Sequence, residues 1–422
     1  MRGTPSPRQP AADAAAPIRV VPGGVTAPAG FRAAGVACGI KKRGTAAEAP
    51  LDLALVTTGG PVPAAAVFTV NKAAAAPVHL SRAHLARSGG RAAAVVINSG
   101  CANACTGEAG LVAASQMAAV TARTTGCRPD EVLVASTGVI GVALPMGKVT
   151  AGIAAAHAAL DARGGDAAMR AIMTTDPFPK SHAVTVEDPR GAFTVGGMAK
   201  GSGMIEPRMA TMLAVVTTDA AIEPGVLDAA LRRVVDDTFN AITVDGECST
   251  NDCVFALASG ASGVRITRPD DPALVEALTA VCGHLAREIV RGGEGATKLV
   301  TVRVTGAASI DDARLAARTI ANSPLVKTAI HGGDPNWGRL VAAAGRSGAA
   351  FVLERASVAI GPVPLFVDGV PHDDRAPDAE RVLEGAEVTV AVDLGTGGGH
   401  EATMWTCDFS AEYVRINAEY RT

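Results

Sequence analysis

A glycine-rich segment near the middle of the chain holds a lysine and a threonine that could do chemistry. It reads GGMAKGSGMIEPRMATML and runs from Gly196 to Leu213, with Lys200 in its first half. Thr211 stands near its end, where the apolar run 212–217 predicts a buried strand. A threonine hydroxyl is a weak nucleophile, but if the bond before it is cut, the freed α-amine can act as its base. That amine has a pKa of roughly 7.7–8.0, so much of it is neutral near that pH. Composition alone favours a simpler interpretation, in which Thr211 is an ordinary strand residue after a flexible loop.

Two further stretches place polar groups at the ends of predicted elements. The apolar segment 131–135 predicts a strand that stops at Ser-Thr-Gly-Val-Ile-Gly, 136–141. Small residues at a strand end can present backbone N–H groups to a developing anion, although a plain turn fits equally well. Glu294 follows a predicted helix, a place where an acidic residue is usually exposed. The acidic cluster within 245–252 resembles a metal site, but acidic turns between strands are usually only solvated.

Composition excludes several classes of protein. The chain has 422 residues, of which 48% are hydrophobic and 19% charged, as in globular proteins. The net charge of −3 argues against a nucleic-acid surface. No apolar run is long enough to span a bilayer, and the N-terminus lacks the apolar region of a secretory signal. We expect residues 1–17, rich in Pro and Ala, to be a disordered extension.

Metal and nucleotide motifs fail on spacing. The eight cysteines form no Cys-x-x-Cys pair, and the eight histidines form no His-Glu-x-x-His motif. We expect reduced cysteines in a cytoplasmic protein, with no metal and no cofactor. Gly147-Lys148 resembles the end of a P-loop, but Val142 stands where the first glycine is required.

The elements that must position these residues alternate between strands and helices. Strands are predicted at 51–56 and 65–70, joined by a turn at 58–61, and at 93–97, 131–135, 212–217, 253–258, 299–304, 357–367 and 387–394. Amphipathic helices are predicted from about 110, at 226–239, 271–292 and 310–320, and after 331–339. The C-terminal tail carries several of the few aromatic residues, so we expect it to be docked.

The central segment, from Lys200 to Leu213, closely resembles the self-cleavage segment of the glutamate N-acetyltransferase (ornithine acetyltransferase, ArgJ) family. Other motifs similar to that family follow in the same order over nearly the whole chain. They are Gly35–Lys42, Phe68–Lys72, Ser136–Gly141, Thr174–Lys180, Gly293–Lys298 and Ala321–Arg339. The last of these indicates only a turn and a helix start. Cys101, Pro177 and Glu247-Cys248 depart from the family pattern.

The resemblance implies a role for each matching residue. It implies a self-cut between Ala210 and Thr211, which gives an α chain of 1–210 and a β chain of 211–422. Thr211 is then the nucleophile, and Thr137 and Gly138 form the oxyanion hole. The implied substrate-binding residues are Thr174, Lys200, Thr211, Glu294, Asn417 and Thr422. We infer that Lys200 suits a substrate carboxylate and Glu294 an ammonium group.

The implied fold is α/β: a four-layer αββα domain, similar to N-terminal-nucleophile hydrolases, at 18–292 and a smaller C-terminal α/β domain at 293–422. The implied reaction is ping-pong transfer of acetyl from N2-acetylornithine to glutamate in arginine biosynthesis, with acetyl-CoA as a possible second donor. An α2β2 assembly is implied as well. Two other classes stay open: an N-terminal-nucleophile amidohydrolase or peptidase, in which water replaces glutamate, and an uncleaved binding protein.

Overall fold

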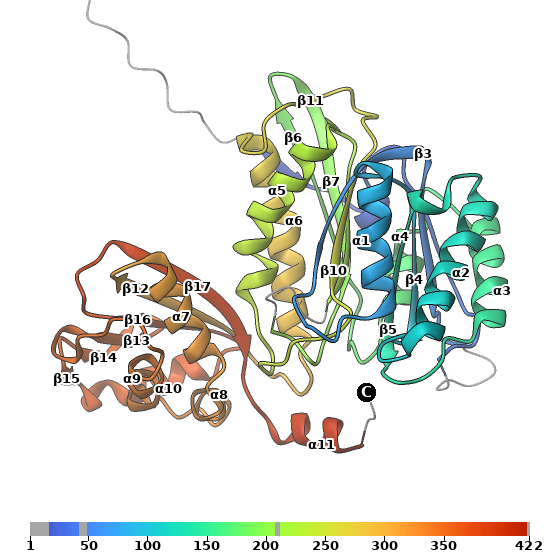
Figure 1. Ribbon diagram of the computed structural model, residues 1–422. Helices are drawn as coiled ribbons and strands as arrows, with labels where there is room; N and C mark the ends of the chain where they lie inside the picture. Colours follow the sequence, from blue (N-terminus) through green and yellow to red (C-terminus); the bar gives the residue numbers. More distant parts are fainter. Residues whose placement is uncertain (1–16, 42–48, 207–211, 420–422) are drawn as a thin grey trace, which may run out of the picture.

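The computed structural model describes residues 17–41, 49–206 and 212–419 (Figure 1). Three of the predicted site residues lie outside these ranges: Ala210, Thr211 and Thr422. Most of the predicted N-terminal extension lies outside them too. None of the described helices is long and apolar enough to cross a membrane.

The larger part of the molecule is built on a nine-stranded sheet that is folded into two layers. Its strands, in spatial order, are β1 (Ile18–Val20), β6 (Lys180–Asp188), β7 (Gly191–Lys200), β8 (Leu213–Thr218), β10 (Cys253–Ala258), β3 (Leu53–Phe68), β4 (Arg91–Cys101) and β5 (Val132–Val139), and β2 (Arg32–Val36) pairs with β3. Because β3 pairs with β10 through its second half and with β2 through its first half, it belongs to both layers.

The prediction of two strands joined by a turn at 58–61 is therefore wrong. β3 is one strand of 16 residues, and its pairing with β4 shifts register between Thr57 and Val62. Such a bulge bends a strand and increases its twist without ending it. Gly59 and Gly60 lie at this bulge, so the glycine pair bends the strand instead of closing a hairpin.

Helices cover both outer faces of the two layers (Figure 1). α5 (Pro224–Asp236) and α6 (Pro272–Arg291) pack on one side, and α2 (Gly107–Thr125) and α3 (Met146–Ala158) pack on the other. Successive strand residues alternate between faces. Leu213 and Val215 accordingly join the core between the layers, together with α4 (Gly165–Ile172), whereas Ala214 and Val216 face α5 and α6. α1 (Ala76–Ser88) packs beside β5 and α2. The fold is the predicted four-layer αββα arrangement.

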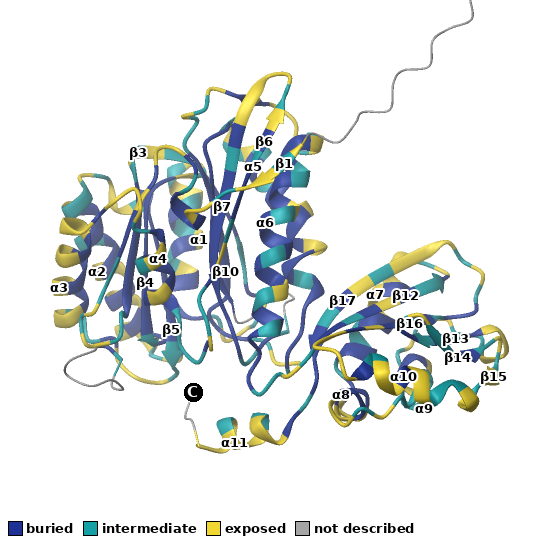
Figure 2. Ribbon diagram, turned by 180° about the vertical axis from the view of Figure 1, so that it is seen from behind, coloured by how far each residue is buried: buried dark blue, intermediate teal, exposed yellow. Residues whose placement is uncertain are grey.

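A second sheet of six strands has its own hydrophobic core. Its order is β15 (Val370–Pro371), β14 (Val363–Val367), β13 (Ser357–Ile360), β16 (Glu387–Asp393), β12 (Leu299–Ala307) and β17 (His400–Cys407). It packs with α7 (Ile310–Ala321), α8 (Pro324–His331), α9 (Trp337–Gly345) and α10 (Ala376–Leu383). Figure 2 shows buried residues concentrated inside each of the two bodies. We propose that the domain boundary falls after Gly292. We call 18–292 the larger domain and 293–422 the smaller domain.

Several predicted elements are confirmed, with corrections at their ends. The strand 253–258 and the helices at 226–239, 271–292 and 310–320 are present as β10, α5, α6 and α7. The strand expected to stop at Ala135 continues to Val139 as β5, because its parallel partner β4 continues beside it to Cys101. Helix α8 was not predicted. It begins at Pro324, and the Ser323 side chain caps it by accepting a hydrogen bond from Val326 N.

Candidate active site

A small cavity of about 130 Å³ gathers six of the predicted site residues. Its lining includes Thr137, Gly138, Thr174, Lys200, Glu294 and Asn417. They come from the end of β5, the loop after α4, the end of β7, the loop after α6 and the terminal helix α11 (Ala411–Glu419). Residues separated by almost 300 positions in the chain therefore meet at one end of the larger sheet, where Figure 1 places α11.

Lys200, the last residue of β7, is buried in this cavity. Its Nζ atom lies 3.4 Å from Thr137 Oγ1. Burial lowers the pKa of the Lys200 ammonium group, since taking a charge out of water favours the neutral form. The nearby carboxylate of Asp176 opposes that effect. Lys200 Nζ is thus a hydrogen-bond donor held inside the protein next to the threonine at the end of β5.

Asp176 is the partner of Lys200 that sequence reasoning missed. Its Oδ1 atom accepts hydrogen bonds from Lys180 Nζ at 2.6 Å and Gly201 N at 2.8 Å. Its Oδ2 atom accepts one from Thr174 N at 3.0 Å, which forms an Asx-type turn within this network. Burial alone would raise the Asp176 pKa, but the charges of Lys200 and Lys180 outweigh it and hold the pKa at about 2.

The Thr137-Gly138 pair has a backbone that only glycine permits at its second position. Gly138 has φ +127°, and a Cβ atom there would lie 2.4 Å from the carbonyl carbon of Gly100. Asn251 fixes the backbone beside this pair: its Nδ2 atom donates to the carbonyl oxygen of Ser136, the preceding residue of β5, at 2.9 Å. The same atom donates to Ala102 O at 2.6 Å. Thr137 is therefore presented to the cavity on a rigid support.

Glu294 lies on the wall formed by the loop after α6 and is buried, contrary to the usual exposure of an acid after a helix. Its Oε2 atom accepts a hydrogen bond from Asn417 Nδ2 at 2.9 Å. Gly203 packs directly on this carboxylate, because a Cβ atom there would lie 2.3 Å from Oε2. The cavity thus has a cation, Lys200, and an anion, Glu294, in its lining, which suits a ligand that carries both charges.

The acidic cluster at 245–252 is less solvated than predicted. Asp245 Oδ2 and Oδ1 accept the N–H groups of Met204 and Ile205 at 2.6 and 2.8 Å, and Tyr413 Oη lies 3.3 Å from Oδ2. Asp252 is buried, and neither of its carboxyl oxygens has a hydrogen-bond partner among the described residues. Burial raises the Asp252 pKa well above its ordinary value and so favours the neutral acid. Glu247 remains exposed.

Asp176 and Tyr413 are thus site residues for which the sequence predicted no role, and the four-residue spacing to Lys180 was the local signal for Asp176. Asp245 and Asn251 belong to the acidic cluster that we interpreted from sequence as a solvated turn. Within the described ranges, no group of three His, Cys, Asp or Glu side chains could hold a metal ion.

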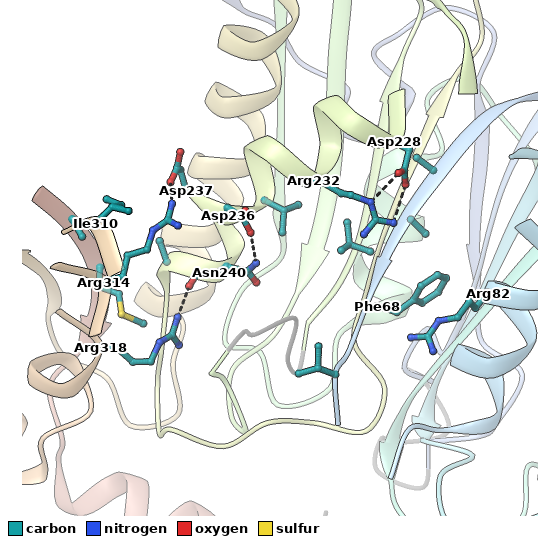
Figure 3. Close-up of a pocket in the computed structure, with 18 of the residues that line it drawn as sticks. Phe68, Arg82, Asp228, Arg232, Asp236, Asp237, Asn240, Ile310, Arg314 and Arg318 are labelled. Carbon is teal, nitrogen blue, oxygen red and sulfur yellow. Dashed lines mark hydrogen bonds and ion pairs between the residues drawn. The ribbon is translucent and has the colours of Figure 1, made fainter. Parts of the chain in front are cut away.

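A much larger groove of about 1140 Å³ runs between the two domains (Figure 3). Charged pairs line this groove (Figure 3): Arg232 pairs with Asp228 within α5, and Arg314 of α7 pairs with Asp237 across the groove. The Arg82 guanidinium lies 5.3 Å from the centroid of the Phe68 ring. The described side chains of this groove offer ion pairs and apolar surface but no activated nucleophile. The small cavity is therefore the candidate site.

Comparison with known proteins finds relatives over nearly the whole chain. Residues 32–422 match the model of the ArgJ family. The arginine biosynthesis bifunctional protein ArgJ of Symbiobacterium thermophilum is 51% identical over 403 residues, which cover 95% of this chain and 99% of that protein. The protein of the same name from Chlorobaculum tepidum is 49% identical over 401 residues, with 94% and 96% covered. A crystal structure of ornithine acetyltransferase complexed with ornithine, from Mycobacterium tuberculosis, is 47% identical with a TM-score of 0.41, and it covers 45% of this chain and 98% of that chain.

Proposed function

The chain belongs to the ArgJ family, and on that premise we propose that it is a self-processing acetyltransferase that moves acetyl from N2-acetylornithine to glutamate. It is an enzyme of the glutamate N-acetyltransferase (ornithine acetyltransferase) type and acts in arginine biosynthesis. One observation carries the finer proposal. Lys200, Glu294 and the Thr137-Gly138 pair line one cavity, and β8, which starts two residues after Thr211, pairs with Lys200 through Leu213.

The proposed maturation cuts the bond between Ala210 and Thr211. The Thr211 hydroxyl oxygen attacks the Ala210 carbonyl carbon, the C–N bond breaks, and the departing nitrogen takes a proton to become the free α-amine. Water then hydrolyses the resulting ester, which regenerates the hydroxyl. The amine is the general base that an N-terminal threonine nucleophile requires.

The proposed transfer uses the same hydroxyl twice. The α-amine takes its proton while the oxygen attacks the acetyl carbonyl of N2-acetylornithine. Thr137 and Gly138 stabilise the oxyanion, a contribution that is typically about 2.7–4 kcal/mol for one donor. Ornithine leaves with the proton, and acetyl remains as an ester on Thr211. The neutral amine of glutamate then attacks this ester, N-acetylglutamate departs, and the hydroxyl recovers its proton.

The charges of the cavity support one orientation of the substrate. In this proposal Lys200 binds a substrate carboxylate, and Glu294, which accepts a hydrogen bond from Asn417, binds the side-chain ammonium group of ornithine. Thr174 and Thr422 complete the proposed set of binding residues. Because Lys200 and Glu294 are both buried, their contacts with substrate are little screened by water.

Three wider properties belong to the same proposal. The relatives' name, bifunctional, supports acetyl-CoA as a second acetyl donor. The two chains from one precursor would assemble as α2β2. The described cysteines form no disulfide bond with one another, which fits the proposed location in the reducing cytoplasm.

The deciding experiment is the intact mass of the purified protein under denaturing conditions, with Thr211→Ala as the control. We expect two fragments, 1–210 and 211–422, in the parent protein and one uncut chain in the control. Acetyl transfer from N2-acetylornithine to glutamate without net release of acetate separates the transferase from an amidohydrolase. An uncut parent chain would contradict the nucleophile and favour a binding protein.

A further inference from the structure

The segment that leads to the proposed cut is held by a helix of the smaller domain. Glu206 is the last described residue before that cut. Its Oε1 atom accepts a hydrogen bond from Arg318 Nη1 at 3.0 Å, and its Oε2 atom accepts one from Asn322 Nδ2 at 2.8 Å. Arg318 lies in the last turn of α7 and Asn322 caps the end of that helix. Both oxygens of the carboxylate are therefore engaged by α7.

The contact of Glu206 with Arg318 and Asn322 is partly shielded from water. The Arg318 and Glu206 side chains are 20% and 17% exposed, whereas the Arg314–Asp237 pair, one turn earlier on α7, is 48% and 74% exposed. Arg318 is also fixed by a second hydrogen bond, from Nη2 to Asn240 O at 3.1 Å. A charged pair that loses solvent on folding holds its geometry better than one on the open surface.

The backbone next to Glu206 is held by residues 244–247 of the larger domain, which α8 of the smaller domain contacts in turn. Ile205 O accepts a hydrogen bond from Val244 N at 2.7 Å, and Glu206 N donates to Glu247 O at 2.9 Å. Lys327, buried on α8, donates from Nζ to Val244 O at 2.8 Å. Helices α7 and α8 thus fix both the segment ending at Glu206 and the chain that runs beside it.

The far side of the cut is fixed as well. Leu213 starts β8 and pairs with Lys200 on one side and Cys253 on the other. A chain that cuts itself must hold its hydroxyl within near-attack distance of its own preceding carbonyl. Fixing both ends of the short stretch between Glu206 and Met212 removes conformations in which that approach fails.

We propose that Arg318 and Asn322 are positioning residues for self-cleavage, acting through Glu206. The inference rests on the proposed function, because it assigns a purpose to the smaller domain in that maturation. None of the described lining of the small cavity comes from α7. The proposal also gives a use to the Ala321–Arg339 segment, since Asn322 and Lys327 both belong to it.

The test follows the uncut full-length chain over time by intact mass during cell-free synthesis. We compare the parent protein with Arg318→Met, with Glu206→Gln and with Arg314→Met. The last is a matched control that removes an arginine from the same helix without touching Glu206. We expect Arg318→Met and Glu206→Gln to cut at least about tenfold more slowly, as misplacement of reacting groups does. Arg314→Met is expected to cut at the parent rate. Acetyl transfer per cut molecule is expected to stay at the parent level in all three.

A charge exchange separates positioning from general damage. In Glu206→Arg combined with Arg318→Glu, the ion pair is restored in reverse and the Asn322 amide can turn its oxygen toward the new arginine. We expect cleavage to recover relative to either single change. If thermal unfolding shows that Arg318→Met does not fold, the test rests on the self-cleavage rate of the isosteric Glu206→Gln.

The outcomes are distinct. If the parent chain is cut, and Arg318→Met and Glu206→Gln are cut at the parent rate, this inference is wrong and the proposed function stands. If Arg314→Met is slowed as much as Arg318→Met, the contact between the domains matters in general and the specific role of Arg318 and Asn322 is overturned. If the parent chain itself stays uncut, the proposed function fails and takes this inference with it.

Discussion

The buried carboxylate of Asp176 forms an ion pair with Lys180, and the charge of Lys200 helps to keep the Asp176 pKa low. Replacing Asp176 by Asn leaves the buried Lys180 ammonium group without its ion-pair partner and removes one of the negative charges that act on Lys200. Because removal of one partner from a buried ion pair typically costs 3–5 kcal/mol, we expect Asp176→Asn to lower the free energy of unfolding by about that amount. Denaturant unfolding at pH 7 measures it.

The matched control for this prediction is Asp166→Asn, which removes an exposed partner of Arg170. Exposed pairs contribute about 0–1 kcal/mol. A loss for Asp176→Asn no larger than that of Asp166→Asn would mean that the lysines are relieved in some other way, such as by loss of a proton from Lys200.

Glu294 lends itself to a test of substrate binding. Gln at this position keeps the shape and an acceptor for Asn417 but removes the negative charge. Hydrogen bonds to charged groups contribute about 1.5–3 kcal/mol, so kcat/KM for N2-acetylornithine should fall roughly 10- to 100-fold in Glu294→Gln. The extent of self-cleavage should not change. Glu247→Gln, an exposed acid on the same cavity, serves as the control, and an equal loss there would contradict a specific role for Glu294.

At this scale the sequence predicts the residues that belong to recognisable motifs and misses their partners. Lys200, Glu294 and Asn417 could be named in advance, and the structure brings them to one cavity. Asp245 could not, because its role comes from accepting the N–H groups of Met204 and Ile205 from about 40 positions away. Local spacing contains no information on such contacts.

Among the elements, α11 is unusual because it has no buried residue. Two of its described hydrogen bonds reach the site: Asn417 donates to Glu294, and Tyr413 Oη lies 3.3 Å from Asp245 Oδ2. Truncation after Ser410 should therefore change the thermal unfolding midpoint by no more than a few degrees, in line with surface changes in a large protein. We expect kcat/KM to fall by at least about tenfold, the equivalent of one lost hydrogen bond to a charged group. A fall in stability without a loss of activity would show that α11 is only structural.

Element types were easier to predict than element ends. The amphipathic pattern identified α5, α6 and α7, because each buries one stripe against a sheet. The ends of β3 and β5 depended on neighbouring strands: β4 continues beside β5, and β2, β4 and β10 share the length of β3. Strand length is set by pairing, which hydrophobic periodicity does not report.

For the whole molecule, the pair His182 and His284 predicts how stability depends on pH. Their rings stack with centroids 4.0 Å apart, one on β6 and the other on α6. Burial, together with the charges of His284 and Arg287, lowers the His182 pKa to about 4, and burial lowers the His284 pKa as well. Between pH 6.5 and 4 the unfolded chain therefore binds protons that the folded protein does not, so stability falls as the pH falls through that window.

The measurement is the thermal unfolding midpoint as a function of pH. His182→Phe keeps a ring in the stack and removes one titrating group, so its midpoint should fall less steeply between pH 6.5 and 4. His157→Phe, which changes an exposed histidine on α3, should follow the parent curve. Identical slopes for all three proteins would show that the stacked pair does not govern this window.

The position of β8 has a consequence for how the protein can be made. β8 lies inside the sheet, hydrogen-bonded to β7 on one side and to β10 on the other. After the proposed cut, β8 lies near the start of the second chain. β7, near the end of the first chain, remains paired with β8. If a divided gene produced the two chains separately, β8 of the second chain would have to insert between two strands of a sheet that had already formed. One continuous reading frame, folded first and cut afterwards, avoids that problem altogether.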